Sequence, residues 1–198
     1  MAYEDGYKIR DQYGMYFLTF TIVGWIDFFT RKECKDILID SMKYCIKKKG
    51  LVVHAFVIMP SHIHVIWSCL DEGIGMSGIV RDFKKYTAVQ LIAWIKDNKK
   101  ESRSDWLDVV FKYHAKYNPN NSKFQVWIQN NMPMELLHPK FIRQKLDYLH
   151  NNPVLAEMVD EPNHYSYSSA LQYCDHTMIS QLRVELLNFG VEEGYVFT

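Results

Sequence analysis

The sequence of 198 residues predicts an α+β fold: a ferredoxin-like β-α-β-β-α-β antiparallel sheet with its helices on one face, followed by a C-terminal helix that carries a tyrosine. Two observations predict this fold. Strand-like and helix-like segments alternate in that order, and two consecutive strand segments are joined by only two residues. The 48% apolar content suits a single globular domain over residues 1–198.

The first third of the chain predicts a strand followed by a helix. Residues 15–23, MYFLTFTIV, are rich in the β-branched and aromatic side chains that strands favour. Residues 31–48 have an amphipathic helical pattern, with Thr30 as a candidate N-cap. The three lysines before Gly50 complement the negative end of a helix dipole, and glycine commonly follows such an end. The helix is therefore expected to stop at Gly50.

Two further strands, a long helix and a last strand follow. Residues 51–59 and 62–69 are apolar runs separated by Pro60 and Ser61, which predicts antiparallel neighbours. The remaining predicted elements are a helix at 77–96, a charged insert at 97–121 with a short helix at 104–110, and a fourth strand at 123–130. In the ferredoxin-like arrangement the third strand is central, so its backbone is stiff.

Two histidines lie within the third predicted strand, in the segment MPSHIHVIW. Side chains alternate between the faces of a strand, so His62 and His64 share one face while Ile63 points into the core. Neutral imidazoles are good ligands for divalent metals. The alternative is that two half-buried histidines merely occupy a sheet face. We expect the pair on the face opposite the two main helices, or at its rim, under the tyrosine-bearing helix.

The tyrosine-bearing helix is predicted in FIRQKLDYLHNNPVLAEMV, residues 141–159. Pro153 is expected to end it, because proline has no N–H and restricts the residue before it. Tyr148 and Asn152 are four residues apart and share a helix face. A tyrosine hydroxyl needs a base or a polarised electrophile to act as a nucleophile, and a phosphodiester beside a bound cation is a suitable target. The alternative is a packing tyrosine followed by a helix stop.

Three segments together resemble the single-tyrosine HUH-endonuclease transposases, the insertion-sequence family that includes the REP-associated tyrosine transposases. These are the His62-Ile63-His64 triplet after Met59-Pro60, the tyrosine segment 146–154 (LDYLHNNPV), and YSYSSA at 165–170. Their order and spacing also agree with the family. The resemblance covers about residues 13–174, the expected core of the domain, and leaves 175–198 as a C-terminal extension.

The resemblance implies cleavage and rejoining of single-stranded DNA next to a hairpin. In this family the tyrosine attacks a phosphodiester, stays joined to the 5′ phosphate and releases a 3′ hydroxyl. Tyr148 corresponds to the nucleophile, and His62, His64 and Asn152 correspond to the ligands of Mg²⁺ or Mn²⁺. Asn151 or His150 could instead supply the third ligand. The family contains both single-chain enzymes and dimers that exchange their tyrosine helices, so a homodimer is one of two options.

The net charge of zero is unexpected for a DNA-binding protein, but the charge is unevenly distributed. Residues 109–134 contain no acidic residue and interleave cations with aromatic rings, as single-strand binding grooves do. A solvated surface loop is the alternative. A second basic cluster lies in the helix at 77–96, where a solvated helix face is the alternative. The candidate DNA-contacting residues are Lys112, Tyr113, Lys116, Tyr117, Lys123, Trp127, Arg81, Lys84 and Lys85.

The four cysteines are scattered without paired spacing, and no signal peptide or long apolar span is present. We therefore expect a cytoplasmic protein, associated with the nucleoid when bound to DNA, and no membrane partner. Two other functions remain open on the sequence. One is a domesticated protein that binds a nucleic-acid hairpin without cutting it, and the other is a metal-dependent hydrolase that uses water.

Overall fold

The computed structural model of the chain describes residues 8–97, 101–118 and 123–188. Its centre is an antiparallel sheet of four strands in the order β2-β3-β1-β4. The strands are β1 (Tyr16–Thr21), β2 (Leu51–Ile58), β3 (His62–Cys69) and β4 (Met134–Glu135). The predicted α+β class and the central place of the third strand are confirmed.

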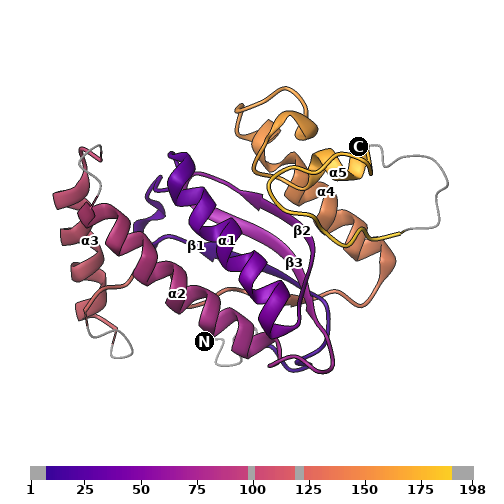
Figure 1. The fold of residues 1–198 in the computed structure, drawn as a ribbon, viewed down its shortest axis with the longest axis horizontal. Helices are drawn as coiled ribbons and strands as arrows, with labels where there is room; N and C mark the ends of the chain where they lie inside the picture. Colours follow the sequence, from indigo (N-terminus) through magenta and orange to yellow (C-terminus); the bar gives the residue numbers. More distant parts are fainter. Residues whose placement is uncertain (1–7, 98–100, 119–122, 189–198) are drawn as a thin grey trace, which may run out of the picture.

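Helices cover both faces of this sheet (Figure 1). On one face, α1 (Lys32–Lys49) and α2 (Met76–Asp97) lie side by side. α4 (Pro139–Leu155) packs against β2 and β3, next to the short α5 (Ala170–Cys174), and α3 (Ser104–Lys116) stands at the far end of the molecule. Two 3₁₀ turns complete the described part: η1 (Val23–Trp25) and η2 (Pro162–His164).

The face under α1 and α2 is an aromatic core. Trp67 on β3 packs against Phe20 on β1 and Phe83 on α2, with ring centroids 5.4 and 5.3 Å away. All three side chains are fully buried. Because strand residues alternate, this packing turns the even-numbered residues of β3, including both histidines, to the opposite face.

Helix ends differ by small amounts from the prediction. α1 starts at Lys32, so Thr30 is not its N-cap, and Arg31 at that position makes no capping hydrogen bond with its side chain. The predicted end is confirmed: Gly50 has φ 75° and donates its N–H to the carbonyl of Cys45. The short helix predicted at 104–110 continues to Lys116.

The prediction that Pro153 ends the tyrosine helix is wrong. Pro153 is buried inside α4, which continues to Leu155 and stops where Glu157 adopts φ 55°. Proline removes one helical hydrogen bond but does not prevent a helix from continuing when packing holds both sides of it. Tyr148 and Asn152 therefore lie on one uninterrupted helix.

The fourth strand lies later in the sequence than predicted. β4 pairs with β1 only at Met134 and Glu135, whereas in the predicted segment 123–130 only Trp127 forms a bridge, to Ile22. Between these two points the register shifts, and Met132 has φ 43°. The ammonium of Lys84 fills the irregularity: its Nζ donates to the carbonyls of Ile128 (2.7 Å) and Gln129 (3.2 Å) and to Oδ1 of Asn131 (2.8 Å).

The YSYSSA segment lies along the free edge of β2. Ser168 forms a bridge with Val57, and the N–H of Ser169 donates to the carbonyl of Phe56 at 3.0 Å. A covered edge cannot pair with another chain. None of the helices in the described residues has the length and apolar character required to span a bilayer.

Candidate functional site

The histidine site comprises four side chains that the sequence singled out: His62, His64, Tyr148 and Asn152. The ring centroids of His62 and His64 are 4.7 Å apart on β3, and the Tyr148 ring lies 5.3 Å from that of His64. Asn152 follows on the next turn of α4, and its side chain influences the pKa of His62. Two segments about eighty residues apart in sequence therefore meet at one point, on the sheet face opposite α1 and α2.

The register of β1 and β3 fixes the orientation of His64. Thr19 is its direct partner across the strands, and Thr19 Oγ1 lies 2.8 Å from His64 Nδ1. Phe17, on the same face of β1, stacks on the imidazole at 5.3 Å. When Nδ1–H donates to Thr19, Nε2 keeps its lone pair and faces the site. Nε2 is buried and has no hydrogen-bond partner among the described residues.

Both histidines are held in the neutral form. Burial is the main cause that lowers the pKa of His64 to about 3, and the charges of His62 and Lys145 contribute to the same shift. Burial also lowers the pKa of His62, against a smaller opposing effect of the Asn152 side chain. Neutral imidazoles are the form that binds metals, and together with the amide of Asn152 they could hold one cation.

His150 is placed away from the site. It is fully buried, and its Nε2 lies 2.8 Å from Ser169 Oγ, which also accepts a hydrogen bond from the N–H of Phe56 at 3.0 Å. Its role as an alternative third ligand is therefore excluded, because the ring is occupied in fixing α4 to β2. This network sets the rotation of α4 and leaves Tyr148 at the surface of the site, 44% exposed.

Sequence reasoning missed two further residues at the site. Lys145 lies one turn before Tyr148, with its Nζ over the rings of Phe17 (5.2 Å) and Tyr148 (5.7 Å). Its i, i+3 spacing to Tyr148 was the available signal. Trp25 follows the end of β1, and its ring meets that of His62 edge-on at 5.6 Å. Thr21, the last residue of β1, pairs with His62, so the turn that follows β1 and contains Trp25 lies beside His62.

The candidate DNA-contacting residues form two groups. Arg81, Lys84 and Lys85 on α2 come together with Lys123 around a cavity of about 500 Å³, named here the basic groove. The ammonium of Lys84 donates to the backbone carbonyl of Ile128, and burial lowers the pKa of Lys84 to about 8. Trp127 is 4% exposed and donates its indole N–H to Thr87, so the prediction that it offers a stacking surface is wrong.

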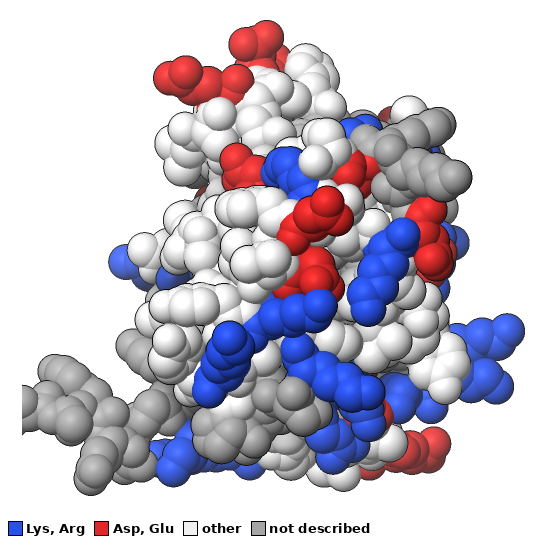
Figure 2. Space-filling view, turned by 90° about the vertical axis from the view of Figure 1, so that its left-hand side faces the viewer, with Lys and Arg blue, Asp and Glu red and all other residues white. Residues whose placement is uncertain are grey.

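The second group lies on α3 and is named here the α3 aromatic end: Lys112, Tyr113, Lys116 and Tyr117. All four side chains are exposed, and the two tyrosine rings meet edge-on at 5.1 Å. Figure 2 looks onto the end of the molecule where α3 lies, and shows Lys and Arg gathered in the lower part of that face, with acidic residues mainly above. The charge is therefore as uneven in space as in the sequence.

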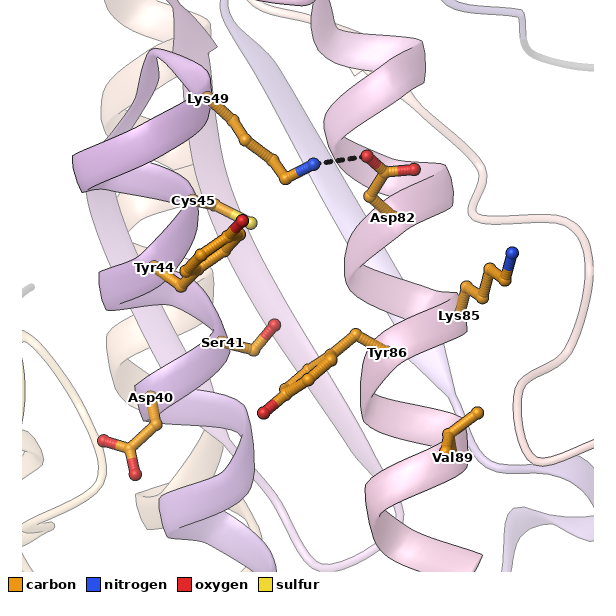
Figure 3. Close-up of a pocket in the computed structure, with 9 residues that line it drawn as sticks. All are labelled: Asp40, Ser41, Tyr44, Cys45, Lys49, Asp82, Lys85, Tyr86 and Val89. Atoms are coloured by element: carbon orange, nitrogen blue, oxygen red, sulfur yellow. Dashed lines mark hydrogen bonds and ion pairs between the residues drawn. The ribbon is translucent and has the colours of Figure 1, made fainter.

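A separate pocket of about 550 Å³ lies between α1 and α2 (Figure 3). The Lys49–Asp82 ion pair spans it, and Tyr44 and Tyr86 line it from the two helices. It belongs to the helical layer, on the other side of the sheet from the histidine site. Lys85 and Val89 line both this pocket and the basic groove, so the two are neighbours.

Comparison with solved structures finds two similar chains. One is a REP-associated tyrosine transposase bound to a REP hairpin, which superimposes with a TM-score of 0.60 at 17% identity over 99% of each chain. At that identity the likeness establishes the fold alone. A second, from Deinococcus radiodurans and also described as a transposase, covers 76% of this chain and 97% of its own at 18% identity, but its TM-score of 0.41 supports no argument. No family model and no curated protein matches the chain.

Proposed function

We propose that this protein is a transposase that cleaves and rejoins single-stranded DNA next to a hairpin through a 5′-phosphotyrosine intermediate. One observation carries the proposal: the Tyr148 ring lies 5.3 Å from the ring of His64, next to His62. The shared fold with a transposase solved on a REP hairpin supports it. The basic groove and the α3 aromatic end are the proposed DNA-contacting surfaces.

The proposed reaction needs no water as a nucleophile. The phenolic oxygen of Tyr148 forms a bond to the scissile phosphorus, the bond from phosphorus to the 3′ oxygen breaks, and that oxygen leaves as a 3′ hydroxyl. Tyr148 is 44% exposed, so solvent can take its proton. Attack of a 3′ hydroxyl on the phosphotyrosine reverses the step, and α4 holds the linkage in place between the two steps.

The residues at the site fit a divalent cation, proposed to be Mg²⁺ or Mn²⁺. Nε2 of His64 is a buried nitrogen without a partner in the described part of the chain, and both imidazoles are neutral. For the third protein ligand we propose the amide of Asn152, which lies one turn after Tyr148 on α4 and interacts with His62. When bound, the cation would polarise the scissile phosphate and offset charge on the leaving oxygen.

Lys145 is the chain's own cation beside the nucleophile. Its ammonium lies over the Tyr148 ring, and its charge is felt at His64. It is placed to attract the phosphate and to stabilise negative charge on the attacking oxygen. Tyr148 lies beside the histidines of its own chain, so one protein chain supplies every proposed site residue. A dimer that exchanges its tyrosine helices stays a prediction.

The test is a denaturing gel of the protein incubated with labelled single-stranded hairpin DNA from the flanks of its own gene, with Mg²⁺ or Mn²⁺. We expect a shifted, protease-sensitive band for the wild type. We expect none for Tyr148→Phe, with hairpin affinity nearly unchanged. Tyr44→Phe is the matched control, because Tyr44 is a 57% exposed tyrosine on α1.

Other results would change the assignment. An adduct with Tyr148→Phe would move the nucleophile elsewhere, and turnover without any adduct would indicate a water-using hydrolase. Binding without an adduct under either metal would favour a hairpin-binding protein that does not cut. The double variant His62→Ala, His64→Ala should lose cleavage, and activity in excess chelator would contradict the role of the metal.

A further inference from the structure

Trp25 combines features that protein packing does not account for. Its side chain is 63% exposed, although it is the largest apolar side chain available, and its ring lies against His62 at 5.6 Å. It stands at the rim of the histidine site. A large exposed aromatic ring at the edge of a reactive site commonly marks a binding surface.

The backbone at Trp25 is unusual as well. Trp25 has φ 54° directly after Gly24 with φ 68°, and bulky residues rarely adopt this left-handed conformation. The turn is fixed from both ends: the N–H of Trp25 donates to the carbonyl of Ile22 at 3.1 Å, and Val23 donates to the carbonyl of Val126 at 2.9 Å. Strain of this kind is concentrated at functional sites. The turn therefore fixes the point at which the Trp25 side chain leaves the backbone, beside His62.

We propose that Trp25 is the stacking platform for a base of the single strand that flanks the scissile phosphate, so that it positions the phosphate over the histidine pair. This rests on the proposed function. Every base has a flat π surface, so an indole can hold a strand without regard to its sequence. Lys145 lies on the Tyr148 side of the site, and Trp25 lies on the His62 side. The bound DNA strand would therefore lie between these two side chains.

The same turn leads towards the α3 aromatic end. A Cβ at Gly24 would lie 3.7 Å from Nε2 of His114, which shows that α3 packs on the turn. Tyr113 is 5.7 Å from His114 and is itself 54% exposed. A DNA strand that runs from Trp25 along α3 would reach the exposed rings of the α3 aromatic end. Stacking could then continue beyond the first base.

The experiment combines Trp25→Ala with abasic DNA. Hairpin oligonucleotides from the flanks of the gene carry an abasic site at each nucleotide on either side of the cleavage point. One abasic position should slow adduct formation by the wild type about tenfold, and Trp25→Ala should slow cleavage of intact DNA by a similar factor. In Trp25→Ala the abasic site should have no further effect. Trp25→Phe should recover most of the rate.

The control is Tyr44→Ala, which removes a 57% exposed aromatic ring on α1, away from the proposed path of the DNA, and should leave the rate unchanged. A rate for Trp25→Ala within twofold of the wild type would overturn the proposal. The proposal would also be overturned if the rate effects of Trp25→Ala and of the abasic site multiplied. Independent effects would mean that the Trp25 ring and that base do not touch.

Binding measured in a Tyr148→Phe background separates this proposal from the cleavage reaction. If abasic DNA and Trp25→Ala weaken binding non-additively while no protein forms an adduct, the stacking role stands and the cleavage proposal fails. If the wild type forms the adduct and Trp25→Ala neither slows it nor weakens binding, cleavage stands and the stacking role fails.

Discussion

The two faces of the central sheet are built from alternate residues of the same strand, yet they differ in nearly every property. On the α1 and α2 side, Trp67 contributes to a closed aromatic core. On the α4 side, His62 and His64 lie beside Thr19 and under an exposed tyrosine. The rigidity of the site therefore comes from the core behind it. Changes to one face should therefore affect stability, and changes to the other should affect chemistry.

The largest expected effect separates the two faces directly. Trp67→Ala should lower the free energy of unfolding by about 3–5 kcal/mol, because it leaves a large cavity under α2. His62→Ala should lower it by less than about 1 kcal/mol while abolishing the DNA adduct, because His62 is only partly buried. Urea denaturation and the adduct gel measure the two quantities.

Trp67→Phe serves as the control for ring loss, since it keeps most of the volume and removes an indole N–H that is buried without a partner in the described structure. Its cost should be well below that of the alanine variant. Equal destabilisation by His62→Ala and Trp67→Ala would show that the faces are not separable.

The next effect is a loss of stability in mild acid that originates on the α4 side. Burial lowers the pKa of both His64 and His150 to about 3, below the ordinary value near 6.5. Above pH 6.5 both histidines are neutral whether the protein is folded or unfolded. Below it, only the unfolded chain takes up protons. Between pH 7 and 5.5 the free energy of unfolding should fall by about 2–3 kcal/mol from these two residues.

Urea denaturation at the two pH values, in chelator, measures this loss. His54 and His62 have pKa values lowered in the same direction and add to it. His64→Gln should reduce the pH dependence, whereas His176→Asn, an exposed histidine, should not. The same pH dependence in His64→Gln and wild type would contradict the buried neutral state of His64.

The smallest effect concerns the attachment of α4 to the sheet. Ser169→Ala removes the hydroxyl that joins His150 to the backbone of Phe56, and should cost about 1–2 kcal/mol because buried polar groups lose their partner. Cleavage should slow as well, since α4 carries Tyr148. Ser166→Ala, at an exposed position in the same segment, is the control. Unchanged cleavage in Ser169→Ala would show that α4 is positioned by other contacts.

Local patterns predicted β1, β2 and β3, and the family resemblance of three segments singled out the candidate site. Period-two alternation placed His62 and His64 on one face, and a spacing of four put Tyr148 and Asn152 on one side of a helix. Errors arose where tertiary contacts override local rules. Pro153 stays helical because it is buried in a packed helix, and the fourth strand is displaced because a lysine side chain bonds to the backbone of the irregular segment.

The remaining site residues depend on sheet pairing, which no local pattern encodes. Thr19 is recognisable as a partner of His64 only once β1 is known to pair with β3 in this register. Trp25 becomes part of the site for the same reason. The partial burial of Lys84 and the full burial of Trp127 likewise follow from the packing of α2 against the fourth-strand segment, so both looked like surface residues in the sequence.

The pairing of Thr19 with His64 and of Thr21 with His62 has a consequence for how this gene can change. A substitution on either face leaves the alternation of the strand intact. An inserted or deleted codon between His62 and His64 moves His64 and every later side chain of β3 to the other face, so the two imidazoles no longer share a face. Length variation among chains of this fold should therefore gather in the connections between elements, and a single inserted alanine after Ile63 should abolish folding and activity together.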